Sequence, residues 1–200
     1  MIKITPDKKK EIITKYNSTA HFYEKRYSNI QFVKFKILLE NYTYDEKIVL
    51  DAGCGTGLVF KKMLRSDIEL KNKFFFFIGL DISWEMLKIF LAKLRVPEII
   101  NTSNKFNLIL ADMEYLPIRE GVIHSVISST SLQNLSDIQR GIQEITRVAK
   151  DDADLKFSIL KKKLNLVKIK ELLNEINIKF EIFNKNDIED ILIQGKIKKI

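Results

Sequence analysis

The chain has 200 residues, a formal net charge of +8 and a pI near 9.4. This length suffices for one α/β domain with a substantial core, so we expect a single domain. No apolar run is long enough to cross a membrane and the lysine-rich start has no uninterrupted apolar segment, so we expect a cytoplasmic protein without membrane contact.

Residues that hold metals or form disulfides are scarce. Cys54 is the single cysteine, so no disulfide can form within the chain. His21 and His124 are the two histidines and lie far apart in sequence, so we expect no metal site. The net positive charge indicates an acidic partner such as RNA, but the basic residues are spread along the chain, and a solvated lysine-rich surface explains them equally well.

Two helices are predicted at the start of the chain. A cap at Thr5 or Asp7 begins a first helix that runs to Tyr16. A second helical stretch contains Tyr23, Tyr27 and residues 32–39.

The stretch Ile48–Gly57 predicts a strand, a tight turn and the start of a helix. Ile48–Leu50 is a short apolar strand, glycines follow at alternate positions 53, 55 and 57, and a helix is predicted over Leu58–Arg65. Glycine permits positive φ and leaves room where a ligand lies against the backbone. Asp51 ends the strand, and its charge suits a cationic ligand. The alternative is a glycine-rich turn without a ligand.

The sequence Asp51-Ala-Gly53-Cys-Gly55-Thr-Gly57 resembles motif I of the class I S-adenosylmethionine-dependent methyltransferases. The resemblance implies S-adenosylmethionine as cofactor, bound by Asp51, Gly53, Gly55 and Gly57. It also implies a helical lid over residues 1–45 and a Rossmann-like core over 46–200.

The spacing Tyr16-x-x-x-Ala20-x-x-Tyr23 is similar to lid segments of small methyltransferases. It implies that Tyr16, His21 and Tyr23 wall the methyl-transfer pocket, with Tyr23 touching the cofactor and His21 as the first candidate base. Alternatively, the aromatic side chains form the buried face of a helix, and His21 is a surface residue.

Two further acids end predicted strands. The strand Phe74–Asp81 is apolar on both faces, as inside a parallel sheet. An acid at its end can accept hydrogen bonds from ribose hydroxyls; Asp81 is the candidate, with Ile82 beside it at the cofactor, and the alternative is a plain cap of the helix Ser83–Leu94. After the strand Asn107–Asp112, the resemblance implies that Asp112 binds the adenine amine and that Met113 packs on the ring. A methionine here is otherwise a core residue.

The fourth strand, Val122–Ser128, ends in a polar segment. Ligands of open parallel sheets bind outside the carboxyl ends of the strands, so residues 128–131, Gln133 and Asn134 are candidates for the acceptor side. Ser128 is assigned to the cofactor, and Asn134 to orienting the acceptor. For each residue the alternative is the capped start of the helix Asp137–Val148.

The remaining segments complete the sheet. A fifth strand is predicted over 153–160, a helix over 164–175, a sixth strand over 178–183 and a last strand over 188–198. No helix separates the last two strands, which predicts a hairpin-like pair. The fold class is therefore α/β, a doubly wound and mostly parallel seven-stranded sheet with a reversed last strand and an N-terminal helical lid.

Methyl transfer from a sulfonium needs alignment rather than a metal, and it needs a base only when the acceptor keeps a proton. Three functions follow. The first is methylation of tRNA or another translation component, because the lid-like N-terminus resembles the wobble-uridine enzymes; a small zinc-binding activator could add a strand to 107–111 if that strand lies at the sheet edge. The second is methylation of a small-molecule metabolite. The third is an inactive cofactor-binding regulatory subunit.

Overall fold

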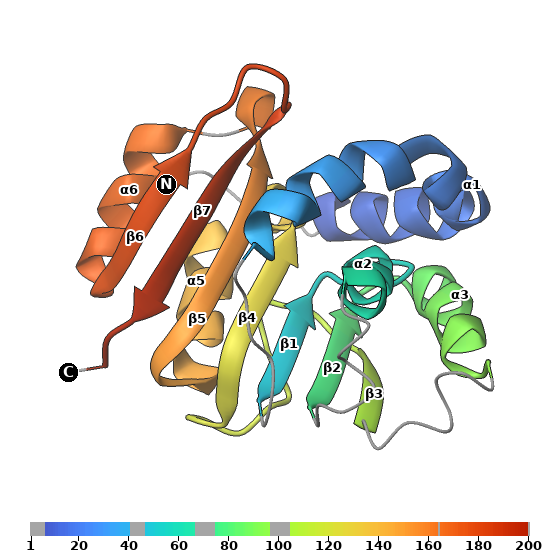
Figure 1. The fold of residues 1–200 in the computed structure, drawn as a ribbon, viewed down its shortest axis with the longest axis horizontal. Helices are drawn as coiled ribbons and strands as arrows, with labels where there is room; N and C mark the ends of the chain where they lie inside the picture. Colours follow the sequence, from blue (N-terminus) through green and yellow to red (C-terminus); the bar gives the residue numbers. More distant parts are fainter. Residues whose placement is uncertain (1–6, 41–46, 67–74, 97–104, 164, 200) are drawn as a thin grey trace.

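The computed structural model describes residues 7–40, 47–66, 75–96, 105–163 and 165–199, which build one sheet with helices on both faces (Figure 1). The predicted cap at Thr5 and the predicted element starts at Phe74 and Leu164 lie outside these residues.

The described elements alternate between strand and helix through most of the chain. The strands are β1 (Ile48–Ala52), β2 (Phe76–Asp81), β3 (Lys105–Leu110), β4 (Ile123–Ser129), β5 (Ala149–Leu160), β6 (Ile178–Phe183) and β7 (Asp190–Ile197). The helices are α1 (Asp7–Leu38), α2 (Leu58–Ser66), α3 (Trp84–Leu94), α5 (Ile138–Val148) and α6 (Leu166–Glu175), with 3-10 turns η2 (Leu132–Asn134) and η3 (Lys161–Lys163). Each predicted strand is present: β6 has the predicted bounds, and the others have shifted ends. β5 begins four residues before the predicted Ala153 because α5 passes directly into it.

The strand order is β3-β2-β1-β4-β5-β7-β6. Strands β1 to β5 run parallel, whereas β7 is antiparallel to both β5 and β6. The predicted doubly wound sheet with a reversed last strand is therefore confirmed. The order changes direction between β1 and β4, and the ligand site of such sheets lies at this point, outside the carboxyl ends.

Two apolar clusters lie on the two faces of the sheet. Along β1, Leu50 belongs to the cluster that packs against α5 and α6, whereas Val49 belongs to the cluster formed with α2 and α3. Successive side chains of a strand point to opposite faces, so a strand between two helical layers has to be apolar on both. This is the reason why β1 before Asp51 and β2 before Asp81 are apolar runs.

Helix α1 is one continuous helix, so the two separate helices predicted for this region are a wrong assignment. It turns back on itself over the carboxyl ends of the strands (Figure 1). Tyr16 bonds to the loop after β4, Glu24 pairs with Lys93 on α3, and Lys34 again contacts the loop after β4. The two helices predicted from the sequence correspond to the two arms of this bent helix. Among the described residues, no helix has both the length and the apolarity needed to cross a membrane.

Gly57 lets α2 approach α3 closely. Its φ is +81°, and a Cβ at this position would lie 2.4 Å from the Phe90 ring of α3. Phe90 is fully buried in the cluster on this face. The third glycine of the motif therefore serves packing between helices.

We expect Gly57→Ala to destabilise the protein more than Gly121→Ala. Both positions have positive φ, which costs an alanine about 1 kcal/mol, but Gly121 has no neighbouring atom within 4 Å of an added Cβ. The overlap with Phe90 adds about 1–3 kcal/mol at position 57. Denaturant unfolding of both variants measures the difference, and equal losses of stability would contradict the packing role of Gly57.

Candidate functional site

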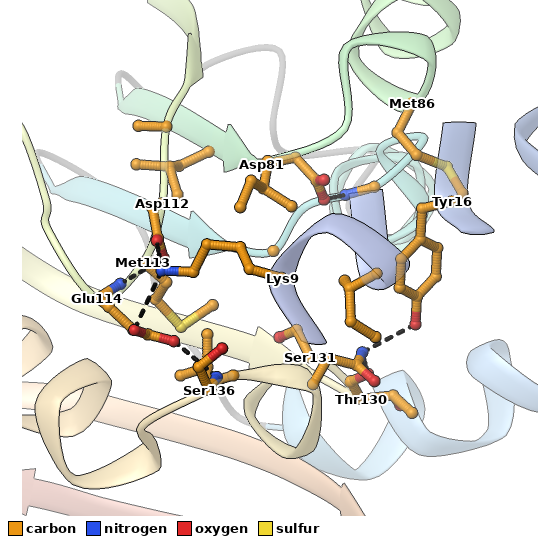
Figure 2. Close-up of a pocket in the computed structure, with 18 of the residues that line it drawn as sticks. Lys9, Tyr16, Asp81, Met86, Asp112, Met113, Glu114, Thr130, Ser131 and Ser136 are labelled. Carbon is orange, nitrogen blue, oxygen red and sulfur yellow. Dashed lines mark hydrogen bonds and ion pairs between the residues drawn. The ribbon is translucent and has the colours of Figure 1, made fainter. Parts of the chain in front are cut away.

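A pocket opens at the carboxyl ends of β1 to β4, beneath α1 (Figure 2). Its walls come from the glycine turn, from the residues that follow β2, β3 and β4, and from the inner face of α1. The lining residues used below are Lys9, Tyr16, Tyr23, Gly53, Gly55, Asp81, Ile82, Asp112, Met113, Glu114, Ser129, Thr130, Ser131 and Asn134. The topology thus gathers at one edge most of the side chains that the sequence assigned to a cofactor.

The glycine turn exposes its backbone to this pocket. A Cβ at Gly53 would lie 2.4 Å from the Cβ of Ser131, so the turn packs directly against the loop after β4. Gly55 has φ +53° and no atom within 4 Å of an added Cβ. Gly55 therefore leaves open space where a ligand can approach the main chain.

The Asp81 carboxylate connects the glycine turn to α3. It accepts hydrogen bonds from the backbone N–H of Gly55 and from that of Ser83, both at 2.8 Å. Ser83 is the N-cap of α3, since its Oγ accepts from the N–H of Met86. Asp81 is therefore not the cap of α3. Burial raises the pKa of Asp81, and the N–H donors oppose that rise.

Asp51 is a fully buried acid beneath the turn. Neither of its carboxylate oxygens has a hydrogen-bond partner among the described residues. Burial, and secondarily the charge of Asp81, raises the pKa of Asp51 well above its usual value. Asp51 does not line the pocket itself, but a cation on the other side of the glycine turn would stabilise its charge.

The acids and the open glycine fit S-adenosylmethionine, which carries an ammonium, a sulfonium and a ribose. Asp81 and the turn at Gly55 would hold the ribose and methionine parts, and Ile82 lines the pocket beside them. When bound, the cofactor supplies an activated methyl group. No cluster of three or more metal-binding side chains occurs in the part of the chain that the structure describes.

The other end of the pocket carries Asp112, Met113 and a lysine that the sequence did not single out. Asp112 accepts a hydrogen bond from the N–H of Glu114 at 2.9 Å, and Met113 is almost fully buried. Lys9 forms ion pairs with both Asp112 and Glu114 (Figure 2). Lys9 is one of three consecutive lysines, and nothing in that run marks it.

Polar groups of α1 and of the loop after β4 meet at the acceptor side. Asn134 Nδ2 donates to Tyr16 Oη at 2.8 Å, which leaves the phenol proton free to reach a ligand. Burial raises the pKa of Tyr16 and of Tyr23, so both phenols stay neutral. Ser128 is buried behind the pocket wall, where its Oγ donates to the carbonyl of Ala52.

Five predicted site residues lie outside the pocket lining: His21, Asp51, Gly57, Ser128 and Gln133. His21 is exposed on α1, and its assignment as a base receives no support from this geometry. Gly57 packs between helices, and Asp51 and Ser128 lie behind the lining.

Comparisons with known proteins match this chain to a family and to a fold. A family model described as a methyltransferase domain matches residues 50–157. The malonyl-[acyl-carrier protein] O-methyltransferase of Hamiltonella defensa is 32% identical over 152 residues, which cover 76% of this chain and 53% of the relative. The chain spans about half the length of the curated relatives it matches first, 55% and 53%.

Two solved structures share the fold. The magnesium protoporphyrin IX methyltransferase of Synechocystis PCC 6803, solved with bound S-adenosylmethionine, has a TM-score of 0.74 at 16% identity over 97% of this chain and 99% of that chain. A methyltransferase in complex with the Trm112 methyltransferase activator of Haloferax volcanii has a TM-score of 0.71 at 16% identity over 92% of this chain and 98% of that chain.

We expect Asp81→Asn to weaken S-adenosylmethionine binding about 10- to 100-fold, since a hydrogen bond to a charged group contributes about 1.5–3 kcal/mol. Calorimetric titration measures the affinity. Asp137→Asn is the matched control: Asp137 is the N-cap of α5 and lies outside the pocket lining, and asparagine caps equally well. Unchanged affinity in a folded Asp81→Asn protein would refute the ribose assignment.

We also expect S-adenosylmethionine binding to release protons. The raised pKa values of Asp51 and Asp81 leave part of these carboxyls protonated above the ordinary aspartate pKa of about 3.9, and a bound cation lowers both values. Affinity therefore rises with pH between the pKa values of the complex and those of the free protein. Titrations in buffers of different ionisation enthalpy measure the release, and Asp51→Asn should reduce it. A binding enthalpy independent of the buffer would contradict this linkage.

Proposed function

The chain belongs to the class I S-adenosylmethionine-dependent methyltransferases, and we propose that it transfers a methyl group to tRNA or to another component of the translation machinery. The observation that carries the acceptor proposal is a group of exposed lysines beside the opening of the pocket. Because β5 runs parallel to β4, Lys162 and Lys163 leave the sheet at the same edge as Thr130.

Exposed lysines also lie on α1, which covers the opening of the pocket. Lys8, Lys10 and Lys15 are exposed on the arm of α1 that reaches the pocket, as are Lys162 and Lys163 after β5. Positive charge on both sides of an opening attracts a polyanion and raises its rate of encounter. An RNA acceptor would bring its phosphates to these lysines while one nucleotide enters beneath α1.

A small activator protein is the second part of the proposal. β3 is the edge strand of the sheet, and the described chain pairs with it on the β2 side alone. Leu110 is 53% exposed at its end. An unpaired edge with exposed apolar side chains can accept a strand from a partner, and a fold neighbour is solved with a methyltransferase activator. We therefore propose that a small zinc-binding protein adds a strand at β3.

A small-molecule or carrier-bound acceptor is the alternative, favoured by the relative named a malonyl-[acyl-carrier protein] O-methyltransferase. In both cases Tyr16 and Asn134 would orient the acceptor against the methyl group, because alignment at contact distance is the main requirement of this displacement. The third hypothesis, a regulatory subunit that binds the cofactor without turnover, differs from both because such a protein transfers no methyl group to any acceptor.

We expect the purified chain, with methyl-labelled S-adenosylmethionine, to label bulk tRNA from cells that lack this protein, either alone or after addition of a copurifying small partner. Replacing Lys162 and Lys163 by glutamine should raise the KM for tRNA several-fold without changing cofactor affinity, since each phosphate contact depends on charge. Lys168→Gln with Lys170→Gln is the control, because these lysines lie on α6 rather than at the end of β5.

Label in a malonyl thioester or a free carboxylic acid, with none in tRNA, would replace the first proposal by the alternative. For the activator, Leu110→Lys should prevent copurification of the partner while leaving S-adenosylmethionine affinity unchanged. Retention of the partner by this variant would refute docking at β3.

A further inference from the structure

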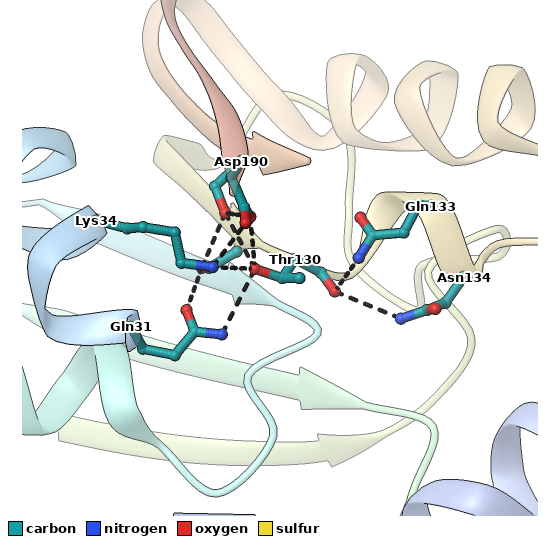
Figure 3. A network of polar contacts seen from close by, with 8 residues as sticks. Gln31, Lys34, Thr130, Gln133, Asn134 and Asp190 are labelled. Carbon is teal, nitrogen blue, oxygen red and sulfur yellow. Dashed lines mark hydrogen bonds and ion pairs between the residues drawn. The ribbon is translucent and has the colours of Figure 1, made fainter. Parts of the chain in front are cut away.

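An ion pair lies fully buried behind the acceptor side of the pocket (Figure 3). Lys34 Nζ on α1 is 3.0 Å from Asp190 Oδ2 at the start of β7, and both side chains are 1% exposed. Neither residue lines the pocket, and nothing in the proposed transfer uses them directly. Burial lowers the pKa of Lys34 while Asp190 opposes this, so the fold keeps a costly pair here.

Thr130 lies between this ion pair and the pocket. Its Oγ1 is 2.6 Å from Lys34 Nζ and donates to Asp190 Oδ2 at 2.9 Å. Ser158 Oγ lies at 3.1 Å and Gln31 Nε2 at 3.5 Å from Thr130 Oγ1. A single hydroxyl therefore joins α1, β5, β7 and the pocket wall.

The backbone of Thr130 is strained. Its φ is +57°, a conformation that β-branched residues rarely adopt and that persists where surrounding contacts determine it. Two sets of contacts hold Thr130 in this conformation. Its hydroxyl takes part in the network described above, and its backbone carbonyl accepts hydrogen bonds from Gln133 Nε2 at 2.6 Å and from Asn134 Nδ2 at 3.4 Å (Figure 3). The buried pair thus fixes the point at which the chain leaves β4.

The position of Thr130 determines where two parts of the pocket wall lie, Asn134 and Ser131. Asn134, held by the Thr130 carbonyl, presents its amide to Tyr16 at 2.8 Å. Ser131 packs where Gly53 has no side chain, and its Oγ donates to the carbonyl of Ala52 at 3.0 Å. A shift of Thr130 would therefore move the acceptor side and the side facing the glycine turn together.

We propose that Lys34 and Asp190 are positioning residues that hold loop 130–134 in its strained conformation through the Thr130 hydroxyl and so align the acceptor with the bound cofactor. The alignment part rests on the proposed methyl transfer, whereas the effect on the loop does not. The two arms of α1 act at the same place, because Lys34 and Gln31 hold Thr130 while Tyr16 holds Asn134.

The decisive variant is the double substitution Lys34→Met with Asp190→Leu. Removing one partner leaves a buried charge unpaired and could prevent folding, but replacing both by apolar side chains of similar size often preserves stability. We expect amide hydrogen exchange in residues 130–135 to become about tenfold faster or more, with unchanged exchange in β1 and β2. We expect kcat to fall about tenfold or more, as for a misplaced reaction partner. The affinity for S-adenosylmethionine should fall by a smaller factor than kcat, because Asp81 and Gly55 lie outside loop 130–134 and keep their own hydrogen bond.

A conservative pair tests the hydroxyl itself. Thr130→Ser keeps the network and should retain the slow exchange and the kcat of the wild type, whereas Thr130→Val should behave like the double variant. The control is Lys47→Met with Asp154→Leu, an ion pair of 2.8 Å at the amino end of β1, which should leave loop 130–134 unchanged.

Unchanged exchange in loop 130–134 of the folded double variant would overturn the proposal, as would equally faster exchange throughout the sheet, which indicates a general role in stability. Faster local exchange with an unaltered kcat would overturn the alignment part. Exchange and cofactor affinity are measured without an acceptor, so failure to label tRNA tests the proposed function separately.

Discussion

The carboxylate of Asp81 joins the parts of the chain on which the pocket depends. Its two oxygens accept the N–H groups of Gly55 and Ser83, so the end of β2 holds both the glycine turn after β1 and the start of α3. An ionised acceptor forms shorter and stronger hydrogen bonds than a neutral one, and here it does so in a buried place that raises its own pKa. A cationic ligand reduces this cost, so the structure of the turn and its affinity for a cofactor have one electrostatic origin.

The bent helix α1 closes the pocket without belonging to the sheet. Its contacts are polar where it faces the loop after β4, through Tyr16, Gln31 and Lys34, and apolar where Phe35 and Leu38 enter the core. The C-terminal arm is thus anchored by burial, whereas the first arm depends on side-chain bonds and ion pairs such as that of Lys9 with Glu114.

The relatives and the surface favour different acceptors. The name of one curated relative describes an O-methyltransferase that acts on malonyl-[acyl-carrier protein]. By contrast, the exposed lysines on α1 and after β5 suit a polyanion. Both proposals assign the cofactor turn to the first half of the site and the pair of Tyr16 and Asn134 to the acceptor half, because one fold can carry different functions. The chemistry of the first half is therefore shared by the family, and the acceptor has to be read from the lid and the loops.

The sequence by itself determined the sheet and most of the residues that meet in the pocket at the carboxyl ends of the strands, because these depend on local patterns. Apolar runs mark the strands buried on both faces, Gly53 and Gly55 mark a turn with positive φ, and acids at the ends of β2 and β3 mark the edge where parallel strands end. One local hint was available for Lys34, a lysine among Phe32, Val33 and Phe35. Only the tertiary structure decided that it meets Asp190 and Thr130, that α1 is one bent helix, that His21 faces solvent and that Lys9 enters the pocket. Each of these facts depends on contacts between residues about 100 or more positions apart or on the path of a helix over the sheet, and no pattern within a window of sequence contains that information.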